Sequence, residues 1–290
     1  MGRRHKNEFG ESLAMNQFTW RNYYDRLRQL AMVRFEYDGM PQEIDQRFLE
    51  KTLFNEGKIL FFKDDDLGEY LTLKSSNLGD WTVYDIPKRR RAYASNGYNR
   101  NLTEKDSVII YNNYLRQPSR LDIEMFAKRL YNIDRAIDVN VNGQKTPIIL
   151  LCEESERLSY LNLYKEYDGN APVIKGTKDL DLDNFRAVTT GAPYVSDKLY
   201  DLKTQIWNEA LTYLGITNVS FQKRERMVTD EINRMLGGTY ASRYTGLLAR
   251  QQACDEINKM FGLNVTVKFR DEFDMTEDYA DTQEGGEEDE

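Results

Sequence analysis

Two long segments with a helical hydrophobic repeat constrain the fold of this chain more than any other feature. The first segment carries five apolar residues at steps of three and four: Ile123, Phe126, Leu130, Ile133 and Ile137. The second segment begins at Ser196 and stops at Gly215, and its apolar residues again follow one side: Leu199, Leu202, Ile206, Trp207, Ala210, Leu211 and Leu214. Such a repeat predicts a helix that buries one face against another helix. We therefore expect two long helices, which pack within one subunit or line up around a ring.

The N-terminal part of the chain is expected to be helical after a short arm. Apolar residues recur at three- and four-residue steps from about residue 16 to 37, and Asp38-Gly39-Met40-Pro41 then ends the pattern. A short helix should follow over 43–54. We interpret residues 1–15 as a flexible basic arm and residues 16–57 as N-terminal helices.

Residues 58–114 change in character to short strands. Stretches rich in β-branched and aromatic residues occur at 59–62, 70–73, 81–86, 91–94 and 108–111. Five short strands in so few residues predict a small antiparallel barrel or sandwich.

Two charged runs in this part have open interpretations. Asp64-Asp65-Asp66 lacks the glycine spacing of a calcium-binding loop, so a solvated turn is expected. Lys88-Arg89-Arg90-Arg91 is either a nucleic-acid or capsid contact or a solvated loop.

The remaining segments complete an α+β fold. The two long helices occupy 115–145 and 191–221, and a compact α/β segment lies between them at 146–190. A basic, glycine-containing stretch at 222–246 is read as a loop, because so long a connection is either functional or mobile. A helix and a strand follow at 247–270.

The charge of the chain is divided between a body and a tail. Residues 271–290 contain eleven acidic residues and no Lys or Arg, so removing them changes the net charge from −8 to −8 + 11 = +3. Such a segment has almost nothing to bury and is expected to be disordered. It serves either as a solubilising tail or as a binding or DNA-repelling one.

Catalytic and metal-binding patterns are missing from the sequence. There is no GxxxxGK[ST], GxGxxG, GxSxG or HExxH motif. One histidine (His5) and two cysteines (Cys152 and Cys254) leave no basis for a zinc site, a histidine triad or a disulfide framework. No apolar run reaches the length of a membrane helix, and no secretory signal follows the basic N-terminus. We expect an oligomeric structural protein that faces a nucleic acid, with no catalytic residues, metal, cofactor or membrane partner.

Several stretches carry a resemblance to a known family. They are FLEK (48–51), VIIYNN (108–113), QKTP (144–147), EYDGNAPVI (166–174), APYVSDKL (192–199), IWNEALTYLGI (206–216), KRERMVTDEI (223–232) and ACDEINKMFGLNVTVKFR (253–270). In this order they resemble the upper collar protein, also called the head–tail connector or portal protein, of small short-tailed bacteriophages of the Picovirinae type. The resemblance covers about residues 20 to 270.

The resemblance implies a portal fold assembled as a ring of about twelve subunits at one capsid vertex. Double-stranded DNA would pass through its central channel during packaging and ejection. The helices near 120–139 and 196–214 would line the channel, and 58–114 would form a small β-barrel in the outer wing. The segment 146–190 would form the clip, which contacts the packaging motor and later the lower collar. The C-terminal part would lie toward the crown.

The resemblance also implies which residues face the DNA. The stretch from Lys223 onward would form loops that project into the channel, and Lys198 matches a channel-ring lysine of the family. A second such lysine falls where this sequence has Thr189, so that ring is lost. The candidate channel residues are Lys198, Lys223, Arg224, Arg226, Arg234 and Arg243. About twelve chains of net charge −8 carry about −96, so the ring should mostly repel DNA while sparse cationic positions guide it.

Partners follow from the same resemblance. Arg3, Arg4 and Lys6 match in character a basic arm that helps to hold a packaging RNA or the motor, although a solvated tail would have the same composition. The other implied partners are the major capsid and scaffolding proteins, a separate packaging ATPase, and lower collar and tail proteins. The protein would then belong to the virion after assembly in the host cytoplasm. The alternative is another collar or tail adaptor ring docked below the portal.

Overall fold

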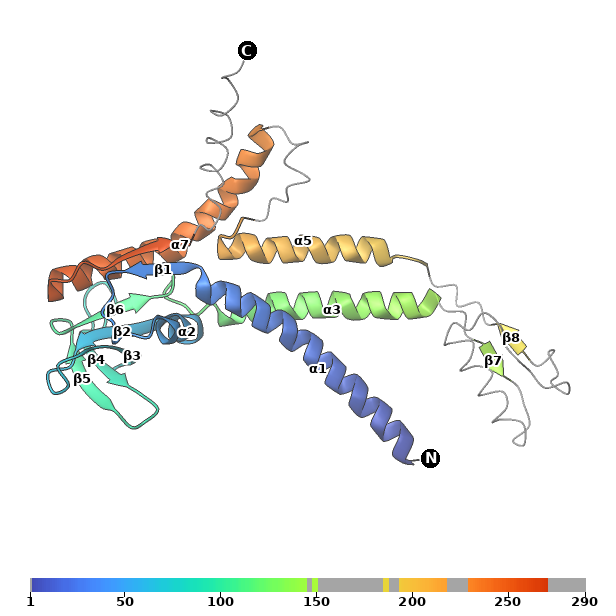
Figure 1. Cartoon of the computed structure of the whole chain (residues 1–290), viewed down its shortest axis with the longest axis horizontal. Helices are drawn as coiled ribbons and strands as arrows, with labels where there is room; N and C mark the ends of the chain where they lie inside the picture. The colour runs from blue at the N-terminus through green and yellow to red at the C-terminus, as the bar shows by residue number, and fades with distance from the viewer. Residues whose placement is uncertain (1, 145–147, 151–184, 188–192, 218–228, 271–290) are drawn as a thin grey trace, which may run out of the picture. The chain divides into compact units, whose positions relative to one another are not determined.

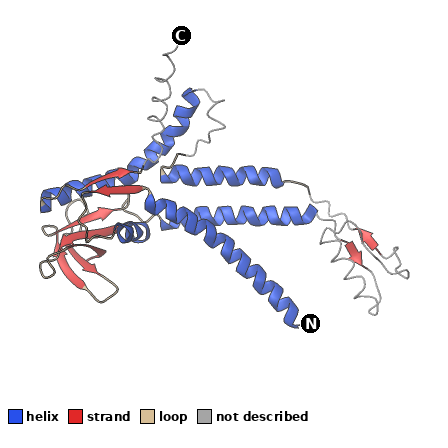
Figure 2. Cartoon of the chain, viewed as in Figure 1, coloured by secondary structure: helices blue, strands red, loops and turns tan. Residues whose placement is uncertain are grey.

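The computed structural model describes the backbone of residues 2–144, 148–150, 185–187, 193–217 and 229–270 (Figure 1). The chain divides into two compact units. One combines Met1–Tyr131 with Gln205–Glu290, and the other is Asn132–Thr204. Both helices and antiparallel strands are present (Figure 2), which confirms the α+β class. Within the described ranges, no helix is long and apolar enough to cross a membrane.

The N-terminal helix differs from the prediction at both ends. Helix α1 spans Gly2–Val33, so residues 2–15 extend the helix instead of forming a separate arm. Seven of these 14 residues are Arg, Lys, Glu, Leu or Met, which tolerate helix well. The helix also ends earlier, because β1 (Phe35–Asp38) pairs antiparallel with β9 (Thr266–Phe269). Phe35 and Tyr37 fit a two-residue period as well as a helical one, and only the distant partner strand decides between them.

Helix α2 (Gln46–Glu56) has clear signals at both ends. The Asp45 side chain accepts a hydrogen bond from the backbone N–H of Arg47, and Gly57 closes the C-terminus with φ 77°. A glycine can adopt this left-handed conformation without steric cost. The buried side of α2 includes Leu49 and Leu53, as expected for a helix packed on a sheet.

Five strands form one sheet in the order β5-β4-β3-β2-β6, with all neighbours antiparallel. They are β2 (Lys58–Lys63), β3 (Tyr70–Asn77), β4 (Arg89–Tyr93), β5 (Asn99–Thr103) and β6 (Ser107–Tyr111). Strands β5 and β6 follow each other in the chain but lie at opposite edges, so the predicted barrel is instead an open sheet. The prediction for 81–86 was also wrong: this stretch is a turn with an isolated bridge between Trp81 and Pro87, and β5 was missed.

The turn at 81–86 is stabilised locally. The Thr82 hydroxyl accepts hydrogen bonds from the backbone N–H groups of Tyr84 and Ile86, at 3.3 and 3.1 Å. Asp85 adopts φ 56°, which an extended strand excludes. The β-branched and aromatic residues that predicted a strand here therefore lie in a folded loop.

Strand β3 divides its pairing between two neighbours, and side chains link strands that do not pair with each other. The first half of β3 pairs with β2 and the second half with β4. The Asp64 carboxylate, which follows β2, accepts a hydrogen bond from Oη of Tyr98, just before β5. It accepts a second one, at 2.8 Å, from Nη1 of Arg100, within β5. Arg90 of β4 donates to the Ser107 carbonyl at the start of β6. The acidic run at 64–66 is thus partly structural: Asp64 is buried, whereas Asp65 and Asp66 are exposed.

The other described helices are α3 (Arg120–Gln144), α5 (Ser196–Leu214) and α7 (Thr229–Phe261). The short strands β7 (Ile148–Leu150) and β8 (Phe185–Ala187) pair antiparallel, and the rest of the expected 146–190 segment lies outside the described residues. Helix α5 matches its predicted span. Helix α7 begins 18 residues before the expected 247, so residues 229–246 are helical and not a loop. Three glycines in this stretch disfavour a helix by only about 1 kcal/mol each, which packing can offset.

Candidate nucleic-acid-contacting residues

Lys198 lies in the first turn of α5 and is exposed. The start of this helix is fixed by Asn140 of α3. The Asn140 carboxamide oxygen accepts from the Val195 N–H at 3.1 Å and from the Ser196 hydroxyl at 2.8 Å. The Asn140 amide donates to the Pro193 carbonyl at 2.9 Å. Because Asn140 holds residues 193–196, which lead into α5, the backbone that carries Lys198 has a defined position.

Exposed charges on α5 are mostly negative. Asp197, Asp201 and Glu209 are exposed, and Lys198 is the exposed cation that has no ion-pair partner among the described residues. Lys203, which is less exposed, pairs with Asp134 at 2.7 Å. A polyanion that approached this helix would meet one available cation among several carboxylates.

In the unit of Met1–Tyr131 and Gln205–Glu290, the C-terminal half of α5 packs against the N-terminal half of α3. Tyr213 Oη donates to Asp122 at 2.6 Å, and its ring lies 5.7 Å from that of Phe126. Burial and the hydrogen bond to Asp122 raise the pKa of Tyr213 to about 12. Arg129 and Glu209 form an exposed ion pair at 3.2 Å. These parts of the two apolar repeats therefore pack as a helix pair within one subunit, which is one of the two arrangements that the sequence left open.

Most of the other expected contact residues are not described at side-chain level. Lys223, Arg224 and Arg226 lie outside the described residues, as does Thr189. Arg234 lies in α7, and Arg3, Arg4 and Lys6 lie in the first turns of α1, but only their backbone is described. Their roles stay predictions.

Arg243 requires a correction, because it is buried and has a structural role. Its side chain is 9% exposed. Its Nε and Nη2 atoms both donate to the Gly215 carbonyl at 3.2 Å, and its guanidinium lies over the rings of Phe269 and Tyr240. Gly215 has φ 76°, and a Cβ atom there would lie 2.8 Å from the Arg243 Cα. Arg243 thus caps the C-terminus of α5 and is not available to DNA.

A second buried arginine caps the same helix end. Arg34 Nη1 donates to the Leu214 carbonyl at 3.0 Å, and its guanidinium lies 4.9 Å from the centre of the Phe35 ring. The last carbonyl groups of a helix lack intrahelical donors and carry partial negative charge, so they attract cations. Burial and the nearby Arg250 guanidinium lower the pKa of Arg34 to about 10, so it stays charged at neutral pH.

Arg250 of α7 is the centre of a buried polar network. It is 1% exposed and forms a two-pronged ion pair with Glu50 of α2. Its Nη1 atom donates to the carbonyls of Asn112 at 2.6 Å and Gly246 at 3.1 Å, and the guanidinium lies 4.0 Å from the Phe35 ring centre. Burial lowers the pKa of Arg250, but the negative charge of Glu50 exceeds this effect and the net shift is upward. Every N–H direction of the guanidinium is used, as a buried charge requires.

The sequence reasoning missed these three arginines as structural residues, although a signal exists. Arg250 lies among buried residues of α7 at helical spacing with Ala253, Cys254 and Ile257. A charged residue on an apolar helix face indicates a buried ion pair. Its partner Glu50, 200 positions away, cannot be found from spacing alone.

Comparison with known proteins places this geometry in context. A family model described as Phage Connector (GP10) matches residues 5–274. Among solved structures, one of the portal and tail of native bacteriophage P68 aligns with a TM-score of 0.52 and 16% identity, covering 96% of this chain and 94% of that chain. An HK97 family phage portal protein from Corynebacterium diphtheriae aligns with a TM-score of 0.44 and 13% identity, covering 86% and 91% of the two chains.

Proposed function

Since the chain belongs to the Phage Connector (GP10) family and is a phage portal, or head–tail connector, protein, we propose that about twelve copies form a ring around viral double-stranded DNA. The ring occupies one capsid vertex of the virion. DNA enters through its channel during packaging and leaves by it during ejection, and α3 and α5 line the channel.

The observation that supports this proposal best is the charge pattern of α5. Lys198 is an exposed cation without an ion-pair partner in the part of the chain that the structure describes, and the carboxylates of Asp197 and Asp201 lie on the same helix. In a ring of about twelve subunits, this position gives a belt of about twelve lysines in a mostly acidic wall. A few cations position the phosphates, whereas the acidic surroundings prevent tight binding. Such a wall lets a polymer slide, which a conduit requires.

The buried arginines supply the rigidity that a conduit needs. Arg34 and Arg243 hold the C-terminal carbonyls of α5, and Arg250 ties α7 to α2 through Glu50. Because these contacts are buried, salt and the passing DNA screen them little. The C-terminal end of α5 is therefore held in place, so the channel wall can resist the force of the moving DNA.

The protein itself works without catalysis in this proposal. A separate packaging ATPase supplies the energy, and the segment at 146–190 binds this motor and later the lower collar. Capsid and scaffolding proteins hold the ring at the vertex. The basic residues at the start of α1 attach a packaging RNA or the motor, so deleting residues 1–10 should weaken that attachment more than ring formation.

A packaging experiment tests the channel role of the cations. The triple variant Lys198→Ala, Lys223→Ala and Arg224→Ala should form rings and capsids normally but retain less genome per particle. A control that removes exposed cations elsewhere, Arg47→Ala with Lys259→Ala, should behave as the parent protein. Equal genome content in all three proteins would contradict the channel role.

A further inference from the structure

The outer face of strand β4 is polar, and its positive charges are not balanced by carboxylates within it. Arg90 and Ala92 point inward and are buried, so the alternate residues of the strand point outward. The pairing register places cross-strand neighbours beside them on the same face. We call the following residues the β4 face: Lys74, Ser76, Arg89, Arg91, Tyr93, Asn99, Asn101 and Thr103. They comprise three cations, an aromatic ring, two amides and two hydroxyls, and the Lys74 ammonium already pairs with Glu56 at 3.5 Å.

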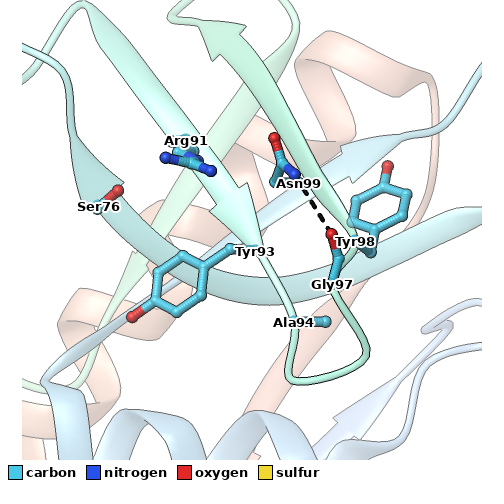
Figure 3. Close-up of a pocket in the computed structure, with 7 residues that line it drawn as sticks. All are labelled: Ser76, Arg91, Tyr93, Ala94, Gly97, Tyr98 and Asn99. Atoms are coloured by element: carbon cyan, nitrogen blue, oxygen red, sulfur yellow. Dashed lines mark hydrogen bonds between the residues drawn. The ribbon is translucent and has the colours of Figure 1, made fainter.

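Arg91 is the central cation of the β4 face. It is exposed and has no hydrogen-bond or ion-pair partner among the described residues. Figure 3 shows its side chain between those of Ser76 and Asn99, with Tyr93 next along the strand. Arg89 pairs only with Asp80, at 3.4 Å, and both side chains are more than half exposed. Two guanidinium groups are therefore available to an oxyanion ligand.

The backbone under these side chains is rigid. Strand β4 is paired on both sides, with β3 and with β5. Arg90 fixes it from the inside, because its Nε donates to the Pro87 carbonyl at 2.9 Å and its Nη1 to the Ser107 carbonyl at 2.5 Å. A ligand at the β4 face would meet a preformed surface, which lowers the entropy cost of binding.

Two hollows lie along β4, and each combines cations with an aromatic ring. The first, of about 420 Å³, is lined by Arg91 and Tyr93, and none of its seven lining residues is acidic. The second, of about 610 Å³, is lined by Lys88, Arg89 and Trp81, together with Lys105 and two carboxylates. The Trp81 side chain is 50% exposed. Arg89 and Arg91 thus lie between two rings, that of Tyr93 at the end of β4 and that of Trp81 in the turn before β4.

We propose that the β4 face binds single-stranded nucleic acid through its phosphates. Arg89 and Arg91 take phosphate oxygens, and the rings of Trp81 and Tyr93 stack on unpaired bases. Proteins that bind single strands combine these two features. An acidic protein segment would use the arginines but not the rings, and a duplex would not offer its bases for stacking. The β4 face contains no residue of α3 or α5, so this proposal can be tested separately from the proposed DNA channel.

Binding of a labelled RNA strand of about 12 nucleotides to the assembled full-length protein tests the proposal. Fluorescence anisotropy is measured between about 50 and 200 mM salt for the parent, Arg89→Gln with Arg91→Gln, Arg91→Lys, and the control Arg47→Gln. The double variant should lose roughly tenfold or more in affinity, because each lost contact is a charge-assisted hydrogen bond. Its salt dependence should also flatten by about 0.7 per lost phosphate contact. Arg91→Lys should keep the salt slope, and Arg47→Gln should bind as the parent.

Two further ligands distinguish binding of single-stranded nucleic acid from binding of a duplex or of an acidic protein segment. A DNA duplex of the same length should bind more weakly than the strand, and a peptide of residues 271–290 should not displace the RNA. The proposal is overturned if the double variant binds RNA like the parent, or if Arg47→Gln loses as much affinity. It is also overturned if the duplex binds as tightly as the strand, or if the acidic peptide displaces the RNA. Ring mass and melting temperature, measured on every variant, show that losses do not come from misfolding.

Discussion

Arg250 of α7 and Glu50 of α2 lie 200 residues apart in the chain and form a buried fork-to-fork ion pair, with Nε 2.9 Å from Oε1 and Nη2 2.8 Å from Oε2. Tyr37 of β1 donates to the same carboxylate at 2.8 Å. Three segments from the two ends of the chain therefore meet at one charge pair. This junction explains how the N-terminal and C-terminal parts form one unit.

Breaking this pair should destabilise the protein strongly. Glu50→Gln leaves the Arg250 charge buried without its counter-charge, and removing one partner of a buried pair typically costs about 3–5 kcal/mol. Glu209→Gln is the matched control, because its pair with Arg129 is exposed and worth about 0–1 kcal/mol. Differential scanning fluorimetry should give a melting temperature several degrees lower for the first variant only. Equal melting temperatures would show that the Arg250 network contributes little.

Gly215→Ala should destabilise more than Gly262→Ala. Both glycines have a left-handed φ, of 76° and 68°, so both substitutions carry conformational strain of about 1–2 kcal/mol. A Cβ at residue 215 would also meet the Arg243 Cα at 2.8 Å, whereas nothing described lies within 4 Å at residue 262. The difference between the two melting temperatures measures the clash alone. If it is zero, α5 and α7 are not packed as closely as described.

Arg243 and Lys198 should separate stability from DNA handling. Arg243→Met removes the donors to the Gly215 carbonyl, so it should lower the melting temperature while DNA retention of correctly assembled particles stays the same. Lys198→Ala should do the opposite, because Lys198 is exposed and unpaired among the described residues. Both quantities are measured on both variants. Loss of DNA retention in assembled Arg243→Met particles would show that Arg243 does contact DNA in the channel.

Asp64 should make stability depend on acid pH. The hydrogen bond from Tyr98, aided by the N–H groups of Leu67 and Asp66, lowers the pKa of Asp64 from 3.8 to about 2. A carboxyl whose pKa is lowered on folding stabilises the fold above its unfolded pKa, and this contribution is lost as pH falls toward 2. The stability advantage of the parent over Asp64→Asn should therefore be constant above about pH 4.5 and shrink below it. Asp66→Asn, at a position 93% exposed, should show no such pH dependence.

Local sequence patterns correctly predicted the helices and strands whose formation depends mainly on residues close to them in sequence. The apolar repeat and Gly215 gave α5 its observed span, and the β-branched runs located β2 and β6. The resemblance supplied the family, which the match over residues 5–274 confirms.

Distant contacts explain the errors. Phe35 and Tyr37 join a strand because β9 lies beside them, more than 200 residues later. Arg243 lies in a basic stretch that the resemblance places in the channel, so it was predicted to contact DNA. Its burial depends on Phe269 and Gly215, which the fold brings to it. Sheet closure likewise depends on whether β5 and β6 pair, and their sequences carry no sign of this.

The mass and shape of the purified full-length protein test the central claim most directly. Twelve copies of a 34.1 kDa chain give about 409 kDa, and particle images should show rings with a central hole. The same images at higher resolution should place Lys198 on the inner wall. A stable monomer or dimer, or rings with Lys198 on their outer surface, would contradict the proposed DNA conduit.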